Sequence, residues 1–315
     1  MTEDMKKLAP ALSTVTAVAK RYFKVIHTVE RVPQGLSTFV YRISTEEGIR
    51  YMRFLPEQAS FAAEALVHRL LRERGVWAPA VVAMEHQNRD TGLSLMITEE
   101  IPGRSVQDLE PGKSLPGILQ EAGRQLALLH QVPVEGFGWI DRSCHNRLKG
   151  EHATFRAYLE EYMDEDLKAL ECYDFTSQQR KQYAKWMEEA LQVLDTPRAV
   201  LVHGDFDISH IFHWDGRFTG FIDFGEIRGC NPLFDLGTLL WTDDSPEKIF
   251  YRSVCEEYGQ VRPIEAEMHC AVSLMALYQL LRFLSRKKDT GAKEFWYRKA
   301  VKQMNFILVE EKELV

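Results

Sequence analysis

The first third of the chain consists of short stretches rich in apolar, β-branched and aromatic residues, separated by polar turns. Thr38–Ile43 and Ile49–Phe54 are two such stretches, and the polar segment 44–48 between them ends in glycine. This pattern predicts two strands joined as a β-hairpin. Two further strands are expected at Val81–Met84 and Leu93–Ile97, on either side of a polar loop.

A helix is expected between these pairs of strands. Residues Gln58–Arg74 carry apolar side chains at helical spacing, and the pattern stops at Gly75. Residues from about 32 to 97 should therefore form a sheet with one helix. The segment Glu99–Gly103 ends in Pro-Gly, which favours a boundary between two lobes.

The chain after this boundary is predicted to be mostly helical, because apolar residues recur there at intervals of three and four. The expected helices are Ile118–His130, Thr154–Leu170, Gln179–Leu194 and Glu265–Leu284, the last apolar around most of its circumference. We therefore expect an α+β, bilobal fold. The small N-terminal lobe would span residues 1–100, with a hinge at about 98–103, and the C-terminal lobe residues 104–315.

The length and charge of the chain restrict the number of lobes and the class of partner that it can bind. A chain of 315 residues is long enough for two lobes with their own cores. Residues 1–100 carry 13 Lys/Arg and 12 Asp/Glu, a net charge of +1, and the remaining 26 and 34 give −8, which together make the overall −7. A nucleic-acid partner is not expected, because phosphate binding needs a basic face. The acidic half favours a cationic or neutral small-molecule partner.

The five cysteines are scattered, and the sequence contains no C-x-x-C pair, as expected for reduced thiols. Neither a signal peptide nor an apolar stretch of membrane-spanning length is expected. These features predict a cytoplasmic protein without a membrane partner, and they leave the oligomeric state open.

The strongest chemical signal is His203-Gly204-Asp205, which follows an apolar run, with His210 five residues after Asp205. A Trp-Asp-Gly-Arg turn then leads to a second apolar strand and to Asp223 of an Asp-Phe-Gly sequence. The catalytic loop of protein kinases has the same layout. His203 and Asp205 are the predicted catalytic residues, with Asp205 orienting or deprotonating a hydroxyl, and His210 and Asp223 are the predicted Mg²⁺ ligands. The alternative is that the two aspartates only cap strand ends.

Several neighbouring residues have less definite roles. Asp207 could contact a substrate or make a local turn bond, and Glu226 directly follows the Asp-Phe-Gly sequence and could face the acceptor. Asp235 is expected to be structural, accepting backbone N–H groups. His130 is expected to be a packed helix residue.

Upstream elements could bind phosphate. Ser37 and Thr38 lie in a turn between strands, without a G-x-G-x-x-G or Walker A pattern. Arg53 is a charge within an apolar strand, and Glu64 on the next helix is its natural ion-pair partner. An ordinary turn and a solvated edge residue are the alternatives. The order of turn, basic strand and acidic helix favours a phosphate site.

These motifs resemble the aminoglycoside phosphotransferase and choline kinase-like family. Beyond the sequences already quoted, the resemblance rests on Glu100-Ile101-Pro102-Gly103, on Asn231-Pro232-Leu233-Phe234-Asp235-Leu236 and on residues 123–130. It implies a kinase-like fold with ATP or GTP between the lobes. Backbone contacts to the base would come from near Glu99 and Ile101, with Thr98 behind the base.

Two positions depart from the usual pattern of this family. His210 replaces the metal-ligand Asn, as in gentamicin-type 2″-phosphotransferases and macrolide phosphotransferases, and Arg53 replaces a Lys. We expect a Mg²⁺-dependent kinase of a small hydroxyl-bearing acceptor, with an aminoglycoside or macrolide antibiotic as one candidate. The alternatives are a kinase of a primary metabolite, such as an amino alcohol or sugar, and a nucleotide-binding pseudokinase. The segment 151–174 holds eight Asp/Glu, which form either a solvated face or a recruiting surface for amines.

Overall fold

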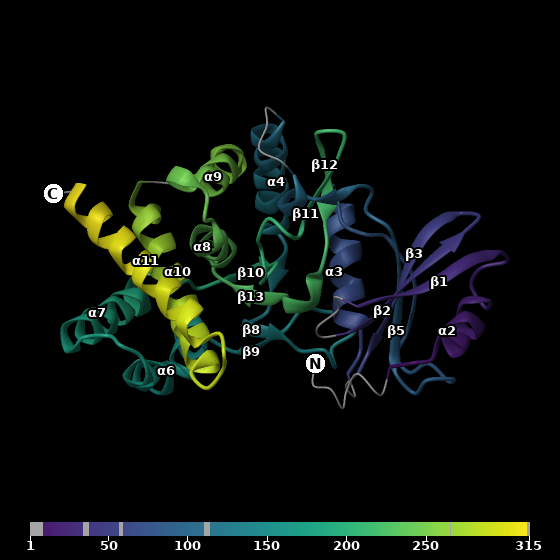
Figure 1. Ribbon diagram of the computed structural model, residues 1–315, viewed down its shortest axis with the longest axis horizontal. Helices are drawn as coiled ribbons and strands as arrows, with labels where there is room; N and C mark the ends of the chain where they lie inside the picture. The colour runs from purple at the N-terminus through teal and green to yellow at the C-terminus, as the bar shows by residue number, and fades with distance from the viewer. Residues whose placement is uncertain (1–8, 34–37, 57–58, 110–113, 265, 314–315) are drawn as a thin grey trace.

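Figure 1 shows the computed structural model of the chain, which describes residues 9–33, 38–56, 59–109, 114–264 and 266–313. A β-rich N-terminal part lies at one end of the molecule and a mostly helical C-terminal part at the other. The predicted division of secondary structure is therefore confirmed for the described residues.

The N-terminal part is built on one antiparallel sheet with the strand order β1-β2-β3-β5-β4. Its hairpin closes where Thr45 pairs with Gly48, which confirms the predicted hairpin. The edge strand β1 was not predicted, because none of its residues is buried and its partly buried and exposed positions do not alternate. The strands are β1 (Ile26–Val32), β2 (Phe39–Thr45), β3 (Gly48–Leu55), β4 (Val81–Glu85) and β5 (Ser94–Glu99).

Two helices pack against this sheet. Helix α2 (Leu12–Ala19) buries Val15 and Val18 in a cluster with side chains of β2 and β3. Helix α3 (Ala62–Glu73) contributes Val67 and Leu71 to the main core of the C-terminal part. Helix α3 therefore ties the sheet to the rest of the molecule, and Figure 1 shows it between the two parts. It begins at Ala62, later than predicted from sequence, and Gln58 lies outside the described residues.

The C-terminal part contains two small sheets, with the orders β7-β10-β13-β8-β9 and β12-β11-β6. Most of these strands have two to four residues, which is too short for a periodic sequence signal, and β6, β7, β8, β9 and β13 were not predicted. Strand β6 pairs with β11, so the chain joins the second part at Arg104. The strands are β6 (Arg104–Ser105), β7 (Pro133–Val134), β8 (Phe137–Ile140), β9 (Gly150–His152), β10 (Ala199–Val202), β11 (Ile211–Trp214), β12 (Arg217–Phe221) and β13 (Arg228–Cys230).

Helices make up most of the C-terminal part, and the predicted ones are found with one exception, whereas α9 and α11 were not predicted. Glu265, the predicted start of one helix, lies outside the described residues. The segment expected as a single helix, Thr154–Leu170, is two helices that meet at Tyr162, whose φ and ψ of −124° and 8° are not helical. Three acidic residues begin the second helix, where they stabilise its N-terminal dipole. The helices are α4 (Leu115–Leu129), α5 (Phe155–Glu160), α6 (Met163–Ala169), α7 (Ser177–Val193), α8 (Leu233–Thr242), α9 (Ile249–Val261), α10 (Ala266–Lys287) and α11 (Lys293–Glu313), and short 3-10 turns are η1 (Val106–Asp108), η2 (Leu170–Cys172), η3 (Phe224–Glu226) and η4 (Pro246–Lys248).

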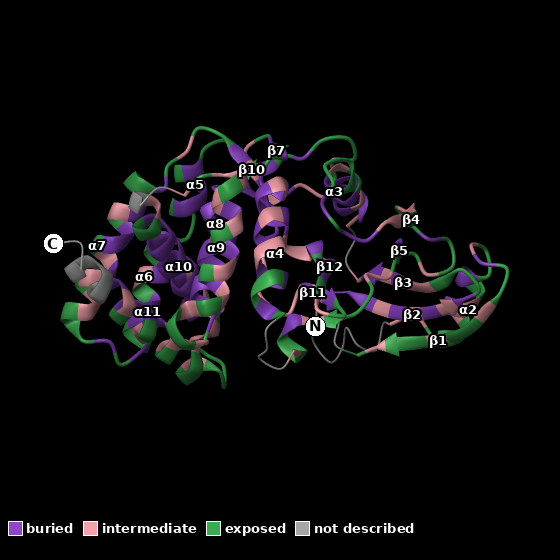
Figure 2. Cartoon of the chain, turned by 90° about the horizontal axis from the view of Figure 1, so that it is seen from above, coloured by how far each residue is buried: buried purple, intermediate pink, exposed green. Residues whose placement is uncertain are grey.

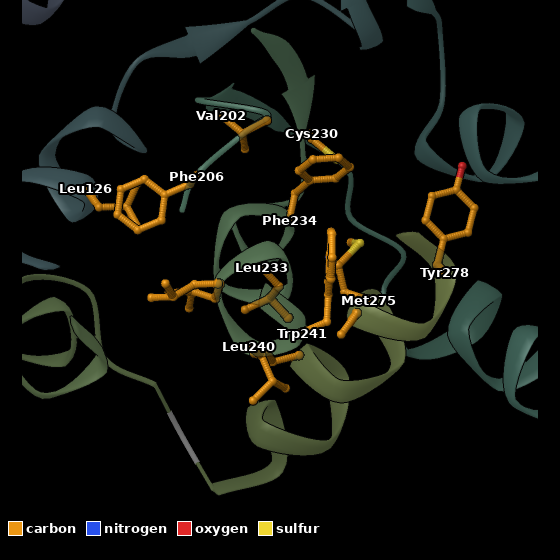
Figure 3. Close-up of a cluster of buried hydrophobic side chains, with 14 of the residues drawn as sticks. Leu126, Val202, Phe206, Cys230, Leu233, Phe234, Leu240, Trp241, Met275 and Tyr278 are labelled. Carbon is orange, nitrogen blue, oxygen red and sulfur yellow. The ribbon is translucent and has the colours of Figure 1, made fainter. Parts of the chain in front are cut away.

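Helix α10 runs through the core, as its apolar circumference predicted, and Figure 2 shows much of it as buried. Its stretch Met268–Lys287 has the length and composition to cross a membrane, contrary to the expectation from sequence, but 72% of the tested window is buried within the protein. Figure 3 shows side chains of β10, α8 and α10, among them Val202, Phe234 and Met275, within one buried cluster.

Helices α4 and α9 lie unusually close together. A Cβ atom added at Gly123 in α4 would lie 2.0 Å from the carbonyl oxygen of Val254 in α9. Only glycine allows the two backbones to approach in this way. The close packing fixes the end of α4, which carries His130 toward the site described next.

Candidate functional site

A cleft of about 1560 Å³ lies between the β-rich part and the helical part. Strands β2, β3 and β5 contribute one wall, and the loops after β10 and β12, together with α10, contribute the other. Asp205, His210 and Asp223 all line it. The structure thus brings the three principal residues singled out in the sequence to one cavity.

The loop after β10 presents Asp205 to the cleft. Gly204 has a φ of +85°, and a Cβ atom there would lie 1.8 Å from the carbonyl oxygen of Glu226. A larger residue would push apart the two loops that carry Asp205 and Asp223. Burial raises the pKa of the Asp205 carboxyl, and the neighbouring His210 and His203 oppose that rise.

Asp235 holds the backbone of this loop from below. One of its carboxylate oxygens accepts the N–H of His203 at 2.7 Å, and the other accepts the N–H of Gly204 at 2.9 Å. His130 Nε2 lies 3.0 Å from the first oxygen, and Tyr258 is bonded to the other nitrogen of that ring. Although burial opposes the charged form, the hydrogen bond from His130 keeps the pKa of Asp235 below its ordinary value. The predicted structural role of Asp235 agrees with these contacts.

The side chain of His203 does not reach the cleft. It is fully buried, its Nε2 lies 2.9 Å from the carbonyl oxygen of Ile222, and its ring packs 4.9 Å from that of Phe224. Burial lowers the pKa of His203, so the neutral ring donates its Nε2 proton to that carbonyl. This placement does not fit the catalytic contact expected from the sequence, and it favours a positioning role beneath the loop.

The hairpin after the loop carries the second carboxylate. Strands β11 and β12 pair from Ile211 with Phe221 to Trp214 with Arg217. Asp215 and Gly216 in the turn both have positive φ, the geometry that suits a tight hairpin, so the predicted turn is confirmed. Asp223, beyond the second strand, also has a left-handed backbone, with φ of 62° and ψ of 68°.

The orientation of His210 is fixed by its own loop. Its Nδ1 lies 2.7 Å from the backbone carbonyl of Asp205, and this contact makes Nδ1 the donor and leaves the lone pair on Nε2 in the neutral ring. Nε2 lies 4.0 Å from Oδ2 of Asp223. Burial opposes protonation, but the carboxylates of Asp207, Asp205 and Asp223 together raise the pKa of His210 above its ordinary value.

Asp207 lies at the edge of this group. Its Oδ1 accepts the backbone N–H of Ser209 at 2.7 Å, which is the local turn bond considered as an alternative for it. Single ligand atoms of Asp205, Asp207 and His210 also lie within 4.8 Å of one another. These three residues were not predicted as one group, and their i, i+2, i+5 spacing is the signal that could have indicated the cluster.

Arg53 and Glu64 form an ion pair at the base of the cleft, as expected from their order along the chain. Arg53 Nη2 also lies 3.8 Å from Oδ1 of Asp223, so the strand and the hairpin meet through charge. Burial of Glu64 opposes ionisation, but Arg53 and His68 lower its pKa to about 2. A permanently charged guanidinium is thereby held toward the cleft.

The remaining N-terminal candidates also line the cleft. Thr38 and Thr98 are buried in its wall, and Glu99 and Ile101 follow at the end of β5. The backbone N–H of Glu99 donates to the carbonyl of Ala80 at 2.9 Å. Ser37 lies outside the described residues.

The far end of the cleft carries charges of both signs. Only Glu151 and Glu161, of the eight acids in segment 151–174, line it, so most of these acids do not face the cleft. Glu226 lines the cleft as anticipated, and its Oε2 accepts from Arg228 Nη2 at 2.9 Å. Four cationic residues that the sequence analysis did not single out line the same end: Arg228, Arg282, Arg286 and Lys287.

A signal for Arg228 was present in the sequence. It interrupts the apolar run from Ile227 to Cys230, much as Arg53 interrupts its strand. No comparable signal marks Arg282, because a basic residue near the end of a helix is usually solvated and favoured by the helix dipole.

Comparison with known proteins places these residues in context. A model described as the phosphotransferase enzyme family, APH, matches residues 28–286. The homoserine kinase of Parvibaculum lavamentivorans is 27% identical over 282 residues, which cover 80% of this chain and 77% of that enzyme.

Solved structures share the fold. The apo form of a thermostable mutant of an aminoglycoside phosphotransferase has a TM-score of 0.70 at 16% identity and covers 95% of this chain and 99% of its own. A ternary complex of that enzyme with ADP and hygromycin B has a TM-score of 0.65 at 17% identity, with 93% and 98% coverage. The macrolide 2′-phosphotransferase of Brachybacterium faecium has a TM-score of 0.64 at 15% identity, with 92% and 96% coverage. The expected kinase-like fold is thereby confirmed.

Proposed function

Because the chain belongs to the phosphotransferase enzyme family, we propose that it is a Mg²⁺-dependent kinase that transfers the γ-phosphoryl group of ATP or GTP to a hydroxyl of a small molecule. The observation that carries this proposal is the convergence of Asp205, His210 and Asp223 on one cleft. Transfer needs one carboxylate facing the hydroxyl and a separate ligand set facing the phosphates, and these residues supply both.

The residues fit a metal site. Two ligands of one Mg²⁺ ion, each at about 2.1 Å, lie between ~3.0 and ~4.2 Å apart. Nε2 of His210 and Oδ2 of Asp223 are separated by 4.0 Å, so one ion could contact both. Mg²⁺, when bound, neutralises charge on the phosphates. His210 and Asp223 would hold it, and the bond between Nδ1 and the loop carbonyl would keep the His210 ring in place.

Asp205 would act on the acceptor. Its carboxylate would orient the hydroxyl and receive its proton while the hydroxyl oxygen bonds to the γ-phosphorus. The bond between that phosphorus and the bridging oxygen breaks in the same transfer, and the nucleoside diphosphate leaves. The raised pKa of Asp205 suits a group that must accept a proton.

The nucleotide would lie under the N-terminal sheet. Arg53, held by Glu64, would contact the α- and β-phosphates. Since the amide of Glu99 already donates to Ala80, we expect its carbonyl and the Ile101 backbone to face the base, with Thr98 behind it. Ser37 and Thr38 belong to the proposed phosphate loop.

We propose that residues 1–100 and 104–315 form two lobes, with the hinge at about 98–103. A cytoplasmic location stays a prediction from the sequence.

The acceptor class has two candidates in this proposal. Aminoglycoside and macrolide antibiotics are supported by the structural likeness, and a primary metabolite is supported by the homoserine kinase relative. The balance of charge at the far end of the cleft favours the metabolite, because a polycation would meet the guanidinium groups of Arg228 and Arg282.

Nucleotide turnover with a panel of acceptors tests the proposal. ADP or GDP release should require Mg²⁺ and increase when the correct hydroxyl compound is added. Asp223→Ala should remove the Mg²⁺ dependence of nucleotide binding, and Arg156→Gln, a change on the exposed surface of α5, should have no effect. Nucleotide binding without any turnover would instead support the pseudokinase alternative.

A further inference from the structure

We propose that the acceptor is a zwitterionic hydroxy amino acid, whose carboxylate binds beside Arg228 and Arg282 and whose ammonium group faces Glu226. This inference rests on the proposed kinase function and adds the chemical class of the acceptor. It follows from how the far end of the cleft is built.

Arg228 is a guanidinium fixed in position before any ligand binds. The residue is 9% exposed and lines the cleft, and its guanidinium lies 4.0 Å from the ring centre of Trp139 and 4.9 Å from that of Phe234. Aromatic faces on an arginine hold its planar group in one orientation. Within the described part of the chain, its buried Nε has no hydrogen-bond partner. Nε is itself covered, so a ligand in the cleft would meet the terminal nitrogens of a guanidinium whose position is already set.

Arg282 provides a second guanidinium on the same wall. Its Nη1 donates to the buried Asp166 at 2.6 Å, and its guanidinium lies 4.1 Å from the ring centre of Tyr162. Tyr158 also lines the cleft; burial raises the pKa of its phenol to about 12, and both guanidinium groups oppose that rise. Each guanidinium carries five N–H donors, so one or two internal bonds leave others for a ligand. A carboxylate is the group that matches such a planar, forked donor.

The partners of these arginines explain why the ligand should also carry a positive charge. Glu226 is bonded to Arg228, and its side chain is still 44% exposed. Its backbone carbonyl lies against Gly204, next to Asp205. An ammonium group at Glu226 would therefore be close to the reacting hydroxyl, with the carboxylate farther along toward Arg282.

The charged residues at this end of the cleft can bind ligand groups of either sign, but they disfavour a ligand that carries charges of one sign only. Among the described residues of the C-terminal part, and apart from Asp205 and Asp223, the acids that line the cleft are Asp108, Glu151, Glu161 and Glu226, and the Arg/Lys residues are Arg228, Arg282, Arg286 and Lys287. Four acids against four bases give a dipolar lining. A molecule with separated opposite charges and no net charge gains from both sets, whereas a polycation or a polyanion is repelled by one.

The test compares acceptors that differ by one charged group. L-homoserine, aminopropanol (the same chain without the carboxylate) and γ-hydroxybutyrate (without the amine) are assayed with Mg²⁺·ATP, alongside L-serine with ethanolamine and one aminoglycoside. We expect the better amino acid to exceed each of its analogues by about 10- to 100-fold in kcat/KM, as charged hydrogen bonds require. An analogue without the carboxylate that reacts as well would overturn the inference.

The remaining outcomes separate this inference from the proposed function. Phosphorylation of the aminoglycoside with none of the amino acids would overturn the zwitterion and leave the kinase standing. Absence of all Mg²⁺-dependent nucleotide turnover would overturn both.

Variants of Arg228 test the residue assignment. In Arg228→Gln, the ratio of kcat/KM for the amino acid to that for the corresponding amino alcohol should fall toward one, and Arg228→Lys should be intermediate. A structural defect would lower both activities equally and leave the ratio unchanged, which would contradict the assignment. Arg156→Gln removes a guanidinium on the exposed face of α5 and is the matched control. If Arg228→Gln is poorly folded, the comparison of acceptors on the wild-type enzyme still decides.

Discussion

The ion pair between Arg53 and Glu64 should be strongly coupled, both in folding and in nucleotide binding. The pKa of Glu64 is about 2 in the folded protein, against 4.5 for the free side chain. At ~1.4 kcal/mol per pH unit, this difference corresponds to about 3 kcal/mol of stability. Removing one partner of a buried pair typically costs about 3–5 kcal/mol, because the other charge is left buried and unpaired.

A double-mutant cycle measures this coupling. Arg53→Gln, Glu64→Gln and the double variant are unfolded with denaturant, and Mg²⁺·ATP affinity is measured by calorimetry on the same four proteins. Each single change should cost about 3 kcal/mol or more in unfolding free energy, and the double variant should cost clearly less than their sum. Affinity should fall in Arg53→Gln, and Glu64→Gln should weaken it as well by releasing the guanidinium.

The contribution of Glu64 to stability should depend on pH in a defined direction. Since the pKa of Glu64 is depressed on folding, the stabilisation is complete above pH 4.5 and is lost as the pH falls toward 2. The exposed pair Arg156–Glu160 is the control, and its coupling should stay near or below ~0.5 kcal/mol. Additivity of the two changes within ~0.5 kcal/mol would refute the reasoning, because residues in one buried charge network must couple.

Three further changes test the proposed roles at the centre of the cleft. Asp205→Asn should lower kcat by about 10²- to 10⁴-fold with nucleotide affinity retained, and near-normal kcat by stopped-flow assay would remove Asp205 from the mechanism. Asp223→Ala should abolish the effect of Mg²⁺ on nucleotide affinity in titrations with and without the ion, and an unchanged effect would reassign the metal. His210→Asn should keep activity and flatten the acid limb of the pH–rate profile at limiting Mg²⁺. Because the pKa of His210 is raised, protons compete with the metal for this side chain at a higher pH than they would for an ordinary histidine. The competition grows as the pH falls. Identical acid limbs in wild type and variant, at limiting and saturating Mg²⁺, would leave His210 structural.

Residues whose spacing is local could be assigned from the sequence. The offset of five between Asp205 and His210 and the hairpin before Asp223 lie within one short stretch of chain, so the sequence itself carries their geometry. The ion pair of Arg53 and Glu64 could also be predicted from the sequence, because a charge inside an apolar strand needs a nearby partner of opposite charge.

Other features depend on contacts between distant segments and left no such trace. His203 belongs to the His-Gly-Asp motif, yet its side chain turns beneath the loop, and only the packing of Phe224 and the carbonyl of Ile222 shows this. Arg282 reaches the cleft only because α10 crosses beside α6, where Asp166 holds it. The break of the predicted helix at Tyr162 likewise depends on tertiary packing, since its amphipathic pattern continues across the break.

The hydrogen bonds of Asp235 to the His-Gly-Asp loop affect the order in which parts of the protein can fold during synthesis. The amides of His203 and Gly204 are held by a residue 32 and 31 positions later, and that residue is bonded to His130, 105 positions earlier. On the ribosome the chain emerges from its N-terminus, so the motif leaves the exit tunnel before Asp235 has emerged. The nascent protein can form its N-terminal sheet early, but it cannot fix its His-Gly-Asp loop until α8 has emerged and docked against the end of α4. A chain interrupted before Asp235 would therefore carry the full His-Gly-Asp and Asp-Phe-Gly sequences with no fixed geometry to use them.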